Sequence, residues 1–139
     1  MANTELFKKI RDQIKRDPKT FDMEAWATDL SLEVDEMGEY LHTYYDPNTG
    51  REEEINASEC GTIRCVAGWA IHFEAERLGM DVNRHLRDVM KDLAKALDID
   101  WGYEAVAEHI LGIDGYGLFY KESDEAYRIV DDYAEGRRG

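Results

Sequence analysis

Apolar residues recur every three or four positions near the start of the chain, which is the spacing of one helix face. Over residues 3–17 these positions are Leu6, Phe7, Ile10 and Ile14. We therefore predict an amphipathic helix that Asn3 or Thr4 caps and that ends before Pro18. A short second helix is expected over residues 23–30, with Asp22 as its cap and Trp26 in the core.

The stretch over residues 62–78 is apolar on nearly every side of a helix. A helix of this kind is surrounded by protein, so we predict that it forms the centre of the core. Thr62 is expected to cap it and Gly79 to end it. The residues expected to pack there are Cys60, Cys65, Ala67, Gly68, Trp69 and, folded back from a later Gly-rich turn, Phe119.

The period of the pattern changes to two between residues 39 and 55, around a "DPNTG" turn. This change predicts a β-hairpin with strands near 39–45 and 51–55 and with Gly50 in the left-handed conformation. A lone hairpin is only marginally stable in water, so one face of its tyrosines should lie against the helices. The other tyrosines would then form a contact surface.

Helical spacing returns over residues 83–97, over 103–111 and in a last helix that Ser123 is expected to cap. The elements together predict a mainly α, single-domain helical bundle around the buried 62–78 helix, with a β-hairpin insertion at about 39–55. N-terminal helices would occupy residues 3–30, the acidic insertion residues 31–59 and the core helices residues 62–135. A chain of 139 residues, of which 43% are hydrophobic, is long enough to bury one core.

Acidic residues are abundant and unevenly spread. The formal net charge is −14, and residues 22–59 hold twelve acidic groups against one basic residue, Arg51. Such a surface repels nucleic acid and anionic membranes, so neither is expected as a direct partner. It attracts basic protein surfaces, although solubility alone is a sufficient reason for the acid. The absence of an apolar signal-peptide core at the N-terminus favours the cytoplasm.

Both cysteines lie in the stretch "CGTIRCVAGWA" over residues 60–70. On a helix, Cys65 and His72 are about 10 Å apart along the axis, which is too far to share a metal ion or a proton. Two buried free thiols are the first interpretation, and a conditional disulfide or a metal site are the alternatives. We expect no metal and no cofactor. The common catalytic motifs are absent, which favours a protein without enzymatic activity.

Three stretches carry a family resemblance: "CGTIRCVAGWA", "AEHILGIDGYGLFY" and "DEAYRIVDDYAEG". With them the chain resembles small uncharacterised proteins of actinobacteria and their phages, which pair a Cys-Gly-Thr-x-x-Cys-x-Ala-Gly helix with a later Leu-Gly…Leu-Phe segment and a closing helix. The resemblance covers about two-thirds of the chain and is lost over residues 28–59. It implies an all-helical core and a phage-like setting, and it carries over no catalytic residue.

These features favour a small acidic module that binds a basic surface of a host or defence protein, with nucleic-acid mimicry as one mechanism. The expected contact residues are Glu33, Asp35, Glu36, Glu39, Tyr44, Tyr45, Glu52, Glu53 and Glu54. One alternative is a cysteine-dependent enzyme or metal-binding protein centred on Cys60 and Cys65. Another is a structural subunit whose acidic surface only confers solubility.

Overall fold

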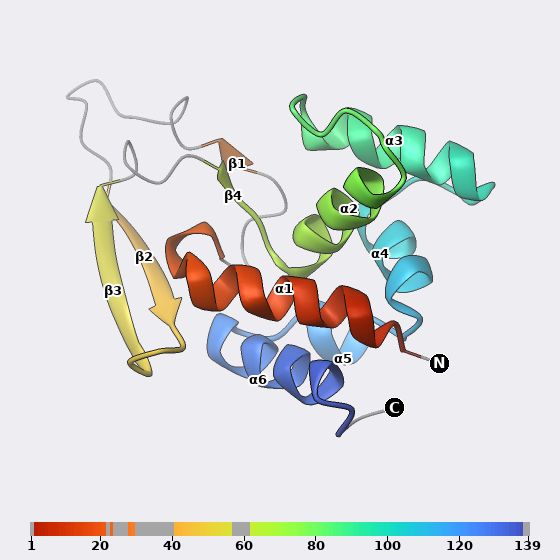
Figure 1. Ribbon diagram of the computed structural model, residues 1–139. Helices are drawn as coiled ribbons and strands as arrows, with labels where there is room; N and C mark the ends of the chain where they lie inside the picture. Colours follow the sequence, from red (N-terminus) through yellow and green to blue (C-terminus); the bar gives the residue numbers. More distant parts are fainter. Residues whose placement is uncertain (1, 22, 24–27, 30–40, 57–61, 138–139) are drawn as a thin grey trace.

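The computed structural model describes residues 2–21, 23, 28–29, 41–56 and 62–137 (Figure 1). Most of these residues are helical. The helices are α1 (Thr4–Arg16), the 3-10 helix η1 (Pro18–Thr20), α2 (Val66–Arg77), α3 (Leu86–Leu97), α4 (Tyr103–Leu111), α5 (Tyr116–Phe119) and α6 (Ser123–Ala134). The strands are β1 (Thr28–Asp29), β2 (Leu41–Asp46), β3 (Arg51–Asn56) and β4 (Thr62–Ile63).

Helix α2 lies at the centre of the bundle. Helices α1, α3 and α4 pack against it, and α6 packs along α1 (Figure 1). Residues 66–71 of α2 are all buried, as expected for a helix with protein on every side. The prediction of a mainly helical bundle around a buried central helix, with a β-hairpin, is confirmed.

Strands β2 and β3 form the predicted hairpin. They pair antiparallel, with Tyr44 opposite Glu53 and Tyr45 opposite Glu52. Gly50 has a φ of +72°, the left-handed conformation that the turn requires. Strand β2 contacts η1 and α6 and lies between β3 and the helices (Figure 1).

The start of α2 differs from the prediction. Thr62 does not cap the helix, because it lies in β4 and pairs with Asp29. The helix begins at Val66, and the Cys65 Sγ caps it by accepting a hydrogen bond from the Gly68 N–H at 3.5 Å. Pairing with β1 keeps Thr62 extended, and a β-branched residue suits that conformation.

The predicted helix over residues 23–30 is wrong at its C-terminal end. Residues 28–29 form β1, which pairs antiparallel with β4. A helix of eight residues is marginal by itself, so pairing with a distant strand overrides the local pattern. The predicted cap Asp22 and the predicted core residue Trp26 lie outside the described residues.

The later helices follow the predicted ranges, with two differences at their starts. Helix α3 begins at Leu86 rather than at residue 83, because His85 Nδ1 accepts a hydrogen bond from the Arg87 N–H at 3.1 Å and so forms the cap. Ser123 does not cap α6. Its Oγ instead accepts a hydrogen bond from the Met23 N–H at 3.1 Å, which ties α6 to the N-terminal part of the chain.

We predict that Gly115 is required for packing at the start of α5. A Cβ there would overlap the Phe119 ring and would meet Glu108 Cγ at 3.0 Å. Gly115→Ala should therefore lower the free energy of unfolding by about 1–3 kcal/mol, measured by urea denaturation. Gly117→Ala is the control, since a Cβ there meets nothing within 4 Å and should leave stability unchanged or slightly raised. Equal losses in both variants would contradict the steric explanation.

Candidate functional site

The hairpin presents an acidic outer strand. Within the described residues β3 pairs only with β2, which separates it from the helices (Figure 1). Three consecutive positions of β3 are glutamates: Glu52, Glu53 and Glu54. Glu52 is exposed and Glu53 is half-buried. The hairpin thus brings together those predicted contact residues that fall on β2 and β3.

The two tyrosines of β2 lie on opposite faces of the hairpin, because side chains alternate along a strand. The ring centroid of Tyr45 is 6.3 Å from that of Tyr127 on α6, so this face is turned towards the bundle. Burial, and then the carboxylate of Asp131, raise the pKa of Tyr127 to about 12, which keeps its phenol neutral. Tyr44 and its partner Glu53 therefore lie on the face turned away from α6.

The acidic groups of the hairpin and of α6 differ in how they are paired. Asp131 of α6 pairs with Arg11 of α1 at 3.6 Å and with Arg137 at 2.7 Å. Glu52 and Glu53 make no ion pair with any part of the chain that the structure describes. Folding therefore pairs carboxylates of α6 with arginines, whereas Glu52 and Glu53 of β3 have no cationic partner among the described residues.

Several predicted site residues lie outside the described residues: Glu33, Asp35, Glu36, Glu39, Trp26 and Cys60. The structure therefore does not place Cys60 relative to Cys65. Among the described side chains, no group of three or more His, Cys, Asp or Glu residues could hold a metal ion.

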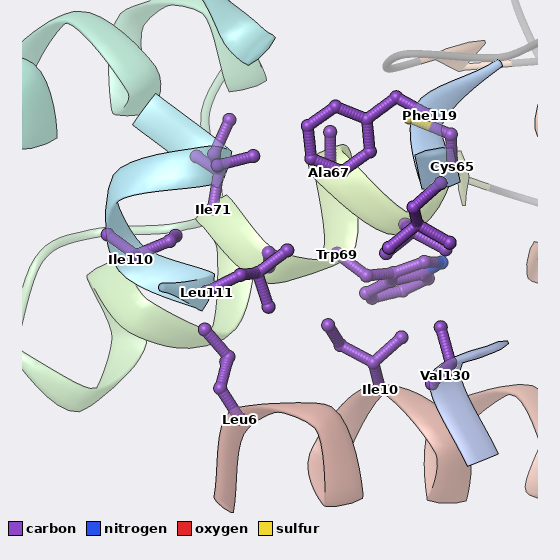
Figure 2. Packing of buried hydrophobic residues seen from close by; sticks show 14 of the residues in the cluster. Leu6, Ile10, Cys65, Ala67, Trp69, Ile71, Ile110, Leu111, Phe119 and Val130 are labelled. Atoms are coloured by element: carbon purple, nitrogen blue, oxygen red, sulfur yellow. The ribbon is translucent and has the colours of Figure 1, made fainter. Parts of the chain in front are cut away.

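The structure buries the residues expected to pack around the start of α2: Cys65, Ala67, Gly68, Trp69 and Phe119. Figure 2 shows the Trp69 ring directed towards Ile10 of α1 and Val130 of α6. The indole Nε1 donates a hydrogen bond to the Thr20 carbonyl oxygen at 3.0 Å. The Trp69 side chain is therefore held at both its apolar and its polar ends.

A polar cluster lies beside Trp69 on α2. Arg64 Nη1 is 3.2 Å from His72 Nδ1, and His72 Nε2 is 3.8 Å from Glu76 Oε2. A guanidinium only donates hydrogen bonds, so Nδ1 is the acceptor and neutral His72 carries its proton on Nε2. Burial, and then the charge of Arg64, lower the pKa of His72, while Glu76 acts in the opposite direction. Neutral His72 is thus the stable form beside Arg64.

Arg64 is not among the residues that the sequence pattern singles out. The available signal is that Arg64 is the one charged residue in the apolar stretch "TIRCVAGWA". A cation in such a stretch is brought close to the core by its neighbours. That no described carboxylate pairs with Arg64, however, depends on the folded arrangement.

No helix within the described ranges is both long and apolar enough to cross a membrane. No protein-family model, curated protein or solved structure matches the chain. The functional inference therefore depends on the hairpin and on the cluster beside α2.

We predict that Cys65 is chemically protected in the folded protein. Its side chain is 2% exposed, and its Sγ is engaged at the start of α2. In the Cys60→Ser variant, DTNB should react with Cys65 on the order of 1,000-fold more slowly than in guanidinium chloride, because modification requires unfolding. The Cys65→Ser variant reports Cys60 in the same assay. Rapid modification of native Cys65 would instead support the cysteine-dependent alternative.

We predict that His72 makes folding stability depend on pH. Its folded pKa lies below the unfolded value of 6.5, so the unfolded chain binds the proton first as the pH falls. Between about pH 7 and 5 this residue should lower the free energy of unfolding by at most about 1.4 kcal/mol per pH unit. The free energy of unfolding would be measured by urea denaturation at several pH values. His72→Gln should make this free energy depend less steeply on pH, whereas His109→Gln, at an exposed position on α4, should not. Identical slopes would exclude this role for His72.

Proposed function

We propose that the chain is a non-enzymatic, acidic protein-binding module that acts in the cytoplasm and inhibits a host or defence protein by docking on its basic surface. The observation that carries the proposal is that Glu52 and Glu53 of β3 make no ion pair within the described residues. The sequence resemblance to proteins of actinobacteria and their phages supports only the phage or mobile-element setting.

Charge pairing supports the hairpin as the contact surface. Carboxylates that already pair with arginines, such as Asp131, would have to exchange one partner for another on binding. Glu52 and Glu53 have no such partner in the described chain, so a basic surface gains their full attraction. Tyr44, on the face turned away from α6, adds an aromatic side chain of the kind enriched at interfaces.

The spacing of charge along β3 supports nucleic-acid mimicry as the mode of binding. A β-strand rises about 3.4 Å per residue, and each strand of B-DNA carries one phosphate per about 3.4 Å of helix axis. Along the strand axis, the three consecutive glutamates at residues 52–54 therefore supply one charge per about 3.4 Å, with Glu53 on one face of the hairpin and Glu52 on the other. A groove that binds the DNA backbone is the partner surface that suits this spacing.

We predict that binding is electrostatic and depends on β3. Immobilised protein would be used to capture partners from a nuclease-treated actinobacterial lysate, and the affinity of each captured protein would then be measured by interferometry. Affinity should fall at least about tenfold between 50 and 200 mM NaCl, and duplex DNA should compete. Reversing three charges, with Glu52→Lys, Glu53→Lys and Glu54→Lys, should abolish binding.

The control variant reverses three charges elsewhere, with Glu5→Lys, Asp100→Lys and Glu125→Lys, all at exposed positions. Both variants have the same net charge, so a general charge effect would weaken binding equally in both. The proposal requires that the affinity of the control stays within about threefold of that of the unmodified protein, a change in binding free energy well under 1 kcal/mol. Binding that is independent of salt, or that survives reversal on β3, would rule out mimicry.

A further inference from the structure

Arg64 is a buried cation at the junction between β4 and α2. Its residue is only 8% exposed, and its backbone N–H donates to the Thr20 carbonyl oxygen at 2.9 Å. The neighbouring His72 side chain is 17% exposed, so the cluster lies just beneath the surface. Arg64 has no role in the hairpin surface described above.

The guanidinium of Arg64 is held in place on its Nη1 side, and its Nε is buried without an acceptor in the described chain. Nη1 lies 3.2 Å from His72 Nδ1, and the guanidinium carbon lies 5.1 Å from the centroid of the Trp69 ring. Trp69 is itself fixed by its hydrogen bond to Thr20. The buried Nε has no hydrogen-bond acceptor, and Arg64 makes no ion pair with the part of the chain that the structure describes.

A buried Nε without an acceptor and the absence of an ion pair with the described chain are both unusual for a buried arginine. A buried charge is normally paired, because its desolvation is strongly unfavourable when nothing compensates for it. Neutral His72 provides one acceptor atom but no negative charge. Burial lowers the pKa of Arg64, which reflects the same imbalance, although an arginine keeps its proton at physiological pH.

We propose that Arg64 anchors a binding site for an oxyanion, a carboxylate or phosphate group, that docks on the Nε–Nη2 edge of the guanidinium. That edge forms a planar fork of parallel donors, which matches two oxygens of either group. His72 and Trp69 fix the orientation of the fork before the ligand arrives. The site lies apart from the hairpin and is independent of the proposed partner binding.

The charges around Arg64 permit an anion despite the acidic chain. On α2, the carboxylate of Glu76 lies beyond the imidazole ring and faces His72 Nε2 at 3.8 Å, and that of Glu74 pairs with Arg77. Tyr103 of α4 contributes only a neutral phenol, whose pKa is raised chiefly by burial. More distant carboxylates are screened, since the Debye length is about 8 Å at physiological ionic strength.

The test measures thermal unfolding in sodium phosphate, sodium acetate and sodium chloride at equal ionic strength and pH 7.5. We expect phosphate or acetate to raise the Tm saturably, on the order of 5 °C well above the Kd, whereas chloride should not. The anion with the larger effect identifies the ligand chemistry. Arg64→Met should abolish the saturable rise, and Arg128→Met, at an exposed arginine of α6, should retain it.

Phosphate also stabilises proteins non-specifically, and that effect appears without saturation in every variant. If Arg64→Met does not fold, Arg64→Lys replaces it, and the loss of the fork should weaken anion affinity at least about tenfold. The Nε–H resonance of Arg64 provides a readout in the unmodified protein, because it should shift on phosphate or acetate titration. No saturable rise in either anion, an equal rise in Arg64→Met, or an unmoved Nε–H resonance would overturn the proposal.

Discussion

The Thr20 carbonyl oxygen is the point on which the centre of the molecule depends. It accepts two hydrogen bonds, from the Arg64 N–H at 2.9 Å and from the Trp69 Nε1–H at 3.0 Å. The first bond holds the chain extended up to Cys65 and so sets where α2 begins. The second places the Trp69 ring in the core between α2, α1 and α6. The same acceptor thus anchors the Arg64 backbone and the Trp69 ring, and the Arg64 guanidinium lies 5.1 Å from the centroid of that ring. A buried carbonyl with two donors also meets the requirement that buried backbone groups be paired.

The elements that sequence reasoning places well are those set by local pattern. Helices α1 and α4 and the β2–β3 hairpin follow from apolar spacing and from turn chemistry around Gly50, and they lie close to the predicted ranges. The predictions are wrong where a residue distant in the sequence determines the local structure. Thr62 is drawn into β4 by β1, and the Ser123 hydroxyl is taken by the Met23 N–H, although both residues have the local signature of a cap. The hairpin part of the candidate site was predictable for the same local reason. That Arg64 has no carboxylate partner among the described residues was not predictable, because a sequence shows which charges exist but not which of them form ion pairs.

The described acidic residues fall into two groups, those that form ion pairs with arginines and those that do not. Arg11 of α1 turns to the C-terminal end of α6, where it pairs with Asp131 and Glu135. Packing α1 along α6 therefore relieves part of the repulsion that a net charge of −14 creates. The hairpin has no comparable cation beside Glu52 and Glu53 in the described chain. Evenly distributed acid would be explained by solubility, whereas a split between paired and unpaired acid gives the hairpin a distinct electrostatic character.

The abundance of acidic residues also affects which counter-ion is expected for Arg64. The chain has 31 acidic against 17 basic residues, so a carboxylate is the most readily available counter-ion for any buried cation. Two other arginines of this protein do find one: half-buried Arg84 lies 2.6 Å from Asp92, and exposed Arg137 lies 2.9 Å from Asp132. Burial makes the need for a partner greater, because the charge loses its hydration. A buried guanidinium with no carboxylate partner in the described ranges is thus harder to account for in this chain than in a basic one. Arg64 has no carboxylate partner among the described residues, yet His72 and Trp69 hold its guanidinium in place, which is the arrangement of a binding group rather than of a structural ion pair.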